Sequence, residues 1–99
     1  MKLYSETIGH GPDLVLLHGW GAHSGVWAGM REALAENFSV TCIDLPGHGH
    51  SPYDQSAMAS LPSLAEAVLA EAPLNASWLG WSLGGLVAQQ AALLEPGRL

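Results

Sequence analysis

Ser82 lies in the segment Gly80-Trp81-Ser82-Leu83-Gly84, which fits the pattern Gly-x-Ser-x-Gly. In enzymes that use this pattern, the serine hydroxyl attacks an acyl carbonyl and becomes acylated. The pattern alone is weak evidence, because a chain with 12 glycines in 99 residues yields roughly 0.1 such matches by chance. The alternative is an ordinary strand-to-helix turn with a capping serine, so the neighbouring elements decide between the two.

The elements on both sides of Ser82 are those that a serine nucleophile requires. The apolar run 76–81 predicts a strand, and the run 83–94 predicts a helix. At a sharp turn between them, Gly80 and Gly84 leave room for the strand and the helix to come close. The helix N-terminus beneath the hydroxyl would stabilise a developing negative charge. This arrangement predicts that Ser82 is a catalytic nucleophile.

Acyl transfer also needs backbone N–H groups that point at the oxygen of the tetrahedral intermediate. One is expected from Leu83, the residue after the nucleophile. The second is expected from the loop His18-Gly19-Trp20-Gly21, which follows a buried strand predicted at Leu14–Leu17. The glycines of that loop let its backbone turn toward the serine, and the Trp20 N–H is the expected donor.

The five histidines are the residues to consider as a general base or as metal ligands. His18 precedes the serine, whereas in folds with this serine turn the order along the chain is serine, acid, then histidine. We therefore expect His18 to support its loop by hydrogen bonding. The others lie in turns and loops and are predicted to be exposed or structural: His10, His23, His48 and His50. Their spacing matches no metal-binding pattern, so no metal site is predicted.

Asp44 and Cys42 are two further residues with chemical potential. Asp44 follows a strand predicted at Ser39–Ile43, but the proline and glycines at 46–49 favour a role in shaping the loop. Cys42 lies within that strand and is predicted to be a small buried hydrophobe. The glycine-rich stretches lack the phosphate-binding patterns, including the lysine of a P-loop, so no nucleotide or other cofactor is predicted.

Strands and helices alternate along the rest of the chain. A leading strand is predicted at 2–8, a helix at 25–37, where apolar residues recur every four positions, and a helix at 61–72. Ser60 or Ser63 could cap the last of these, and Ser63 with Glu66 matches a capping box. The alternation predicts an α/β fold with a mostly parallel sheet.

The composition limits the possible partners. Nine acidic residues against three basic ones give a net charge of −6 without a basic patch, so nucleic acid is not an expected partner. No stretch approaches the ~18 apolar residues of a membrane span, and the N-terminus does not resemble a signal peptide. A single cysteine fits a reducing compartment. We expect a cytoplasmic protein without membrane contact.

Four segments together resemble the α/β-hydrolase superfamily. They are Leu16-Leu17-His18-Gly19-Trp20-Gly21, Val26-Trp27, Asp44-Leu45-Pro46-Gly47-His48-Gly49-His50-Ser51 and Trp78-Leu79-Gly80-Trp81-Ser82-Leu83-Gly84-Gly85-Leu86-Val87-Ala88. The first and last are similar in more detail to the carboxylesterases that cleave the methyl ester of pimeloyl-acyl carrier protein in biotin synthesis. The resemblance covers nearly the whole chain. It implies a three-layer α/β-hydrolase core with a mostly parallel sheet, incomplete after the helix that follows the serine turn.

The resemblance also implies roles for individual residues. Ser82 would be the nucleophile, Trp20 and Leu83 would bind the ester carbonyl, and Trp81 would line the acyl pocket. In that family the acid and the base histidine lie further along the chain, with a helical lid between them that contacts the acyl carrier protein. Residues 1–99 would then be the N-terminal part of one domain, without the lid and the C-terminal core, and would be inactive alone.

Two alternatives remain open. The protein could be another serine α/β-hydrolase, such as a carbon–carbon bond hydrolase or a menaquinone-pathway lyase, because these resemble it in both loops. It could also be a noncatalytic fragment or binding module that keeps the serine turn as a scaffold. Serine rather than aspartate at position 82 argues against epoxide hydrolases and haloalkane dehalogenases.

Overall fold

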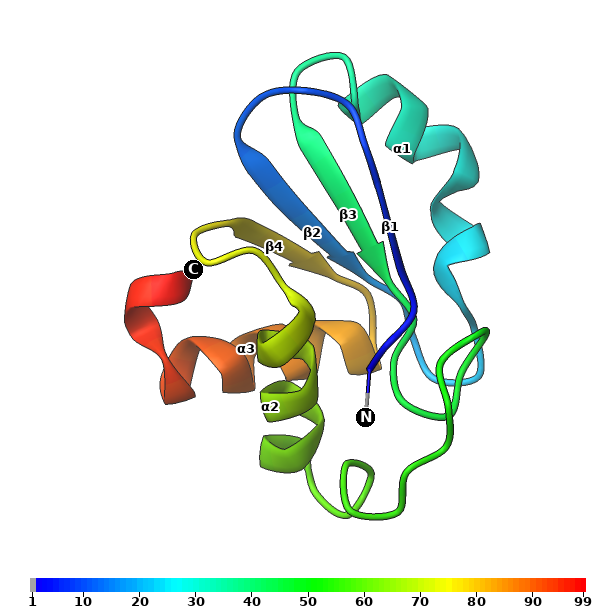
Figure 1. Ribbon diagram of the computed structural model, residues 1–99, viewed down its shortest axis with the longest axis vertical. Coiled ribbons are helices and arrows are strands. Elements are labelled where there is room, and N and C mark those ends of the chain that lie inside the picture. Colours follow the sequence, from blue (N-terminus) through cyan, green and yellow to red (C-terminus); the bar gives the residue numbers. More distant parts are fainter. Residues whose placement is uncertain (1) are drawn as a thin grey trace.

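Four strands form one sheet in the computed structural model, which describes residues 2–99 (Figure 1). They are β1 (Ser5–Ile8), β2 (Asp13–Leu17), β3 (Ser39–Ile43) and β4 (Ser77–Gly80), arranged in the order β1-β3-β2-β4. β2 is parallel to both β3 and β4, whereas β1 is antiparallel to β3. The predicted α/β fold with a mostly parallel sheet is therefore confirmed. The leading strand is shorter than the predicted 2–8.

Helices and short 3₁₀ turns connect strands β2, β3 and β4 and follow β4. They are η1 (Ser24–Trp27), α1 (Ala28–Leu34), α2 (Leu61–Glu71), α3 (Leu83–Leu94) and η2 (Pro96–Arg98). The prediction of one helix over 25–37 was wrong in its extent. The first turn is a 3₁₀ helix, in which the Val26 N–H donates to the His23 carbonyl at 3.1 Å, and the His23 side chain caps it by accepting a hydrogen bond from the Gly25 N–H at 3.0 Å. The end tightens in the same way, since the Asn37 N–H donates to the Leu34 carbonyl.

The start of α2 decides between the two capping serines. Ser60 has an extended backbone, and its hydroxyl accepts a hydrogen bond from the Ser63 N–H at 3.2 Å, so Ser60 is the N-cap. Ser63 lies inside the helix, and the capping box predicted for it with Glu66 was therefore wrong. Pro62 falls in the first turn, where its missing N–H breaks no helical hydrogen bond.

Helices lie on both faces of the sheet (Figure 1), and an apolar core lies between the sheet and the helices on each face. On one face, α2 and α3 pack on alternate residues of β2 and β3; this core is formed by Val15, Leu17, Ile43, Leu45, Val68, Val87 and Ala91 with their neighbours. On the other face lies a smaller core under η1 and α1, formed by Leu16, Trp27, Val40 and Cys42. Cys42 is a buried free thiol, as predicted. Alternation of the β2 side chains between the two layers is what fixes the sheet register.

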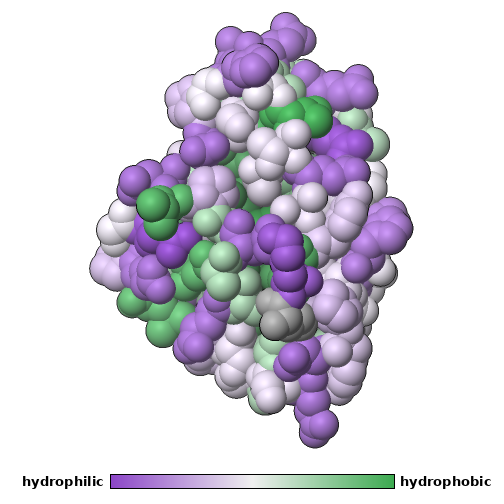
Figure 2. All heavy atoms as spheres, in the orientation of Figure 1, coloured by the Kyte–Doolittle hydropathy of each residue, from purple (hydrophilic) through white to green (hydrophobic). Residues whose placement is uncertain are grey.

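β4 is an edge strand within residues 2–99, because it pairs with β2 alone. Leu79 of β4 is exposed, and so are Leu86, Leu93 and Leu94 of the adjacent α3. Figure 2 shows hydrophobic surface gathered around the C-terminal part of α3. No helix of the described residues is long and apolar enough to cross a membrane.

Candidate active site

The turn between β4 and α3 has an unusual backbone at Ser82. Its φ of 56° and ψ of −119° make it the one residue other than glycine with a positive φ among residues 2–99. Such a conformation costs of the order of 1–3 kcal/mol and persists only where the surroundings enforce it. Here the Gly84 N–H donates to the Trp81 carbonyl and the Gly85 N–H to the Ser82 carbonyl, which starts α3 at once. The Ser82 residue remains exposed on this turn.

Gly80 and Gly84 are required in this turn because a side chain at either position would collide with backbone atoms. A Cβ on Gly84 would collide with the Leu17 carbonyl oxygen and lie 2.6 Å from that of His18. A Cβ on Gly80 would collide with the backbone of Gly84 itself. The first turn of α3 therefore rests directly on the end of β2. The sequence predicted that the strand and the helix come close here, and the structure shows that the backbone atoms of Leu17, His18 and Gly84 leave no room for a side chain.

The loop after β2 lies against the serine turn. The Trp81 N–H donates to the Leu17 carbonyl at 3.0 Å, and a Cβ on Gly19 would be 3.2 Å from Cβ of Ser82. No acceptor within residues 2–99 takes a hydrogen bond from the N–H of Trp20 or from that of Leu83, the first residue of α3. Both predicted donors thus have N–H groups without an acceptor among residues 2–99, and their role as oxyanion donors stays a prediction.

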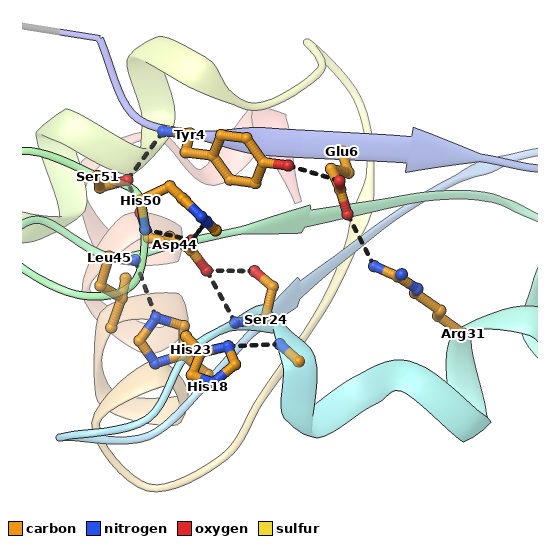
Figure 3. A network of polar contacts seen from close by, with 11 residues as sticks. Tyr4, Glu6, His18, His23, Ser24, Arg31, Asp44, Leu45, His50 and Ser51 are labelled. Carbon is orange, nitrogen blue, oxygen red and sulfur yellow. Dashed lines mark hydrogen bonds and ion pairs between the residues drawn. The ribbon is translucent and has the colours of Figure 1, made fainter.

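His18 is fully buried at the start of this loop, with both ring nitrogens bonded to backbone; Figure 3 shows the bond to Leu45. The Leu45 N–H donates to Nε2 at 3.0 Å, so Nε2 carries no proton. Nδ1 must then carry the proton and donate to the Gly19 carbonyl at 2.7 Å. Burial lowers the pKa of His18 and keeps this neutral form. The ring links the loop to Leu45 and has no nitrogen left for the serine.

A model of the alpha/beta hydrolase family matches residues 14–98, which is most of the chain. The chain belongs to this family. In an α/β hydrolase the serine turn, the preceding strand and the following helix are shared features of the fold, and the structure shows all three here.

Two curated relatives with the same name are each 54% identical to the chain. An enzyme named pimeloyl-[acyl-carrier protein] methyl ester esterase from Methylococcus capsulatus is 54% identical over 97 residues, covering 98% of this chain and 37% of the relative. One of the same name from Aeromonas hydrophila is 54% identical over 99 residues, covering 100% and 39%. A solved hydrolase from Pseudomonas aeruginosa PA01 has a TM-score of 0.88 at 34% identity, covering 97% and 38%. The chain spans less than two fifths of these proteins.

The two tryptophans predicted at the site lie at the surface. Trp20 is 70% exposed, and its ring meets that of His48 edge-on at 5.1 Å between centroids. Trp81 is 55% exposed and lines an apolar cavity of about 390 Å³ together with Val26, Trp27, Met30, Leu79 and Gly80. This cavity lies beside the serine turn, and the role of Trp81 at an acyl pocket stays a prediction.

Among the described residues, none of the other four histidines forms a hydrogen bond with Ser82. His10 and His23 are exposed, His48 is buried with Nδ1 3.0 Å from the Pro46 carbonyl, and exposed His50 has Nδ1 3.8 Å from Asp44 Oδ2. No group of three potential metal ligands occurs within residues 2–99.

Asp44 has partners that sequence reasoning missed. Its Oδ1 accepts hydrogen bonds from the N–H and the hydroxyl of Ser24 at 2.8 and 2.6 Å, and its Oδ2 accepts one from the His50 N–H at 2.9 Å (Figure 3). The expectation that Asp44 shapes its own loop is confirmed by the bond to His50. The bond to Ser24 has no sequence signal beyond a carboxylate placed directly after a buried strand.

The buried His18 predicts how stability responds to acid. The pKa of His18 in the folded chain lies below the usual 6.5. As the pH falls, the unfolded chain therefore binds a proton at this histidine before the folded chain does. The free energy of unfolding should therefore fall by about 1 kcal/mol as the pH drops from 7 to 5.5. Urea unfolding at low micromolar concentration measures this difference.

His18→Gln should reduce that pH dependence, because glutamine does not titrate. The matched control is His10→Gln at an exposed position, which should leave the fall in place. Equal pH dependence in the parent chain and in His18→Gln would contradict the assignment of a buried neutral ring.

Proposed function

We propose that this chain supplies the nucleophile and the oxyanion donors of a serine carboxylesterase that hydrolyses the methyl ester of pimeloyl-acyl carrier protein. The assignment of the nucleophile rests on the backbone of Ser82, which has a positive φ. The turn is crowded at Gly80 and Gly84 and lies against the loop that contains Gly19. The substrate comes from the names of the 54% identical relatives. Residues 1–99 are proposed to be the N-terminal part of one hydrolase domain.

The reaction proposed for this site has two halves. The Ser82 oxygen bonds to the ester carbon while its proton passes to a general base, and the carbonyl electron pair moves onto oxygen as an oxyanion. The N–H groups of Trp20 and Leu83 donate hydrogen bonds to that oxyanion. Methanol leaves with the proton from the base, and water then hydrolyses the acyl-enzyme by the same route to release the free acid.

The general base and its acid partner are proposed to lie outside residues 2–99. No histidine nitrogen among these residues bonds to the Ser82 hydroxyl, and the His18 ring is saturated by backbone groups. Without a base the hydroxyl stays protonated and is a poor nucleophile. The chain alone is therefore expected to be inactive. Contacts with the carrier protein and a cytoplasmic location, which suits the free buried Cys42, belong to the same proposal.

The test uses a chimera in which this chain replaces the matching segment of the M. capsulatus relative. We expect the chimera to release methanol from pimeloyl-acyl carrier protein methyl ester, and the isolated chain to show no turnover. Mass spectrometry of the carrier protein detects the loss of the methyl group. A folded chimera that cleaves p-nitrophenyl acetate but not the pimeloyl ester would reject the substrate and retain the serine hydrolase.

A further inference from the structure

The loop that carries Trp20 is tied at both of its ends to the segment that follows β3 (Figure 3). At the start, the His18 ring accepts a hydrogen bond from the Leu45 N–H. At the end, the N–H and hydroxyl of Ser24 both donate to Asp44. Two consecutive residues after β3 thus hold the whole loop between them.

The carboxylate of Asp44 is built into its place. Asp44 is 2% exposed, and the Asp44 N–H donates to the Tyr4 carbonyl while its carbonyl accepts from the Ser51 hydroxyl at 2.6 Å. A Cβ on Gly49 would lie 2.6 Å from the carboxyl carbon, so this loop closes around the side chain. Burial alone would raise the pKa of Asp44, but the hydrogen bonds from Ser24 and from the His50 N–H lower it overall, so the group stays ionised.

We propose that Asp44 is a positioning residue for the oxyanion site, and that it acts by holding Ser24 and with it the far end of the loop that presents the Trp20 N–H. This inference rests on the proposed function of that N–H. A buried, ionised acceptor of two hydrogen bonds from one residue is a strong anchor, because charge-assisted bonds are about twice as strong as neutral ones. Asp44 touches no reacting atom in this scheme.

The geometry explains why such an anchor matters. Trp20 itself is largely exposed, and the one backbone bond inside the loop joins the Ala22 N–H to the Gly19 carbonyl at 3.2 Å. The two ends of the loop therefore help to set the direction of the Trp20 N–H, together with the close approach of Gly19 to the Trp81 ring and the contact of the Trp20 ring with His48. An oxyanion donor is worth about 10²–10³ in kcat, and a misplacement of about 1 Å can cost 10².

The test uses the chimera with p-nitrophenyl acetate, a substrate that needs the oxyanion site but no pimeloyl group. Asp44→Ala should lower kcat by about 10- to 100-fold with KM within about twofold, because the lost interaction acts in the transition state. Ser24→Ala, which removes one of the two bonds, should lower kcat less. In the double variant kcat should be no lower than in Asp44→Ala, since both changes break the same link.

The matched control is Asp54→Ala. Asp54 also accepts a backbone hydrogen bond within a loop, from the Ala57 N–H at 2.9 Å, but it has no bond to the Trp20 loop. Its kcat should equal that of the parent. If Asp44→Ala does not fold, Ser24→Ala decides. A folded Ser24→Ala or Asp44→Ala with parental kcat, or with loss in KM alone, would overturn the inference.

A second measurement does not depend on activity. In the 99-residue chain, Asp44→Ala should speed hydrogen exchange at the Ala22 amide by at least about tenfold while the amides shared by β2 and β3 keep their protection. Equal exchange at Ala22 in both proteins would overturn the inference. An inactive chimera would reject the proposed function, and exchange at Ala22 would still decide the role of Asp44.

Discussion

Ser82→Ala in the chimera is expected to lower kcat by about 10⁴–10⁶-fold. The change deletes the atom that would form the acyl-enzyme, while the backbone hydrogen bonds that shape the turn are kept, since all of them involve N–H and carbonyl groups. The loss corresponds to about 5–8 kcal/mol of transition-state stabilisation. Steady-state hydrolysis of p-nitrophenyl acetate measures it, and mass spectrometry should show an acylated intermediate only where Ser82 is present.

The matched control for this change is Ser77→Ala. Ser77 is an exposed serine on the same strand, at the opposite end from the turn. Its activity should equal that of the parent chimera. Residual turnover by Ser82→Ala within tenfold of the parent, with unfolding behaviour unchanged, would show that another group is the nucleophile.

Gly84→Ala is the second change with a large expected effect. The new Cβ would meet the carbonyl oxygens of Leu17 and His18, which are backbone atoms at the end of a fully paired strand and cannot rotate away. Helix α3 would have to move outward, and overpacking of this kind costs about 1–3 kcal/mol of unfolding free energy. Because α3 carries the Leu83 N–H, kcat in the chimera should also fall, by about 10² for a shift near 1 Å.

Gly29→Ala is the matched control for Gly84→Ala. Gly29 is also a helical glycine, but a Cβ at its position meets nothing within 4 Å. Alanine should raise the free energy of unfolding by about 0.5–1 kcal/mol through its better helix propensity. Urea unfolding of both variants tests the pair. A Gly84→Ala protein as stable as Gly29→Ala would mean that the close approach of α3 to β2 is not required.

The sequence predicted most of the elements because each has a local cause. The continuous apolar run of β2 and the helix over Leu83–Leu94 could both be read from their own residues, and the latter agrees with the prediction at both ends. The helix expected over 25–37 shows the limit. Its first turn is a 3₁₀ helix with a Val26 N–H to His23 carbonyl bond, and an amphipathic pattern does not distinguish this turn from an α-helical one. The Ser60 cap was one of two alternatives that propensity alone could not separate.

The candidate site was predictable in its parts and less so in their connections. The glycines around Ser82 indicated a crowded turn, and in the structure the crowding atoms are backbone atoms of Leu17, His18 and Gly84. By contrast, the bond from Ser24 to Asp44 joins residues whose separation along the chain matches no local motif. Long-range polar contacts of this kind depend on strand register, which places the ends of β2 and β3 side by side.

The strand order also has a consequence for how the molecule folds. Leu17 pairs with Ile43 on one side and with Gly80 on the other, a partner more than twice as far along the chain. Closing the longer loop costs more entropy, so contacts of β2 with β3 should form before those with β4. The two links that hold the Trp20 loop need only the first pairing. The Trp20 loop would then be in place before the chain segment bearing Ser82 docks beside it.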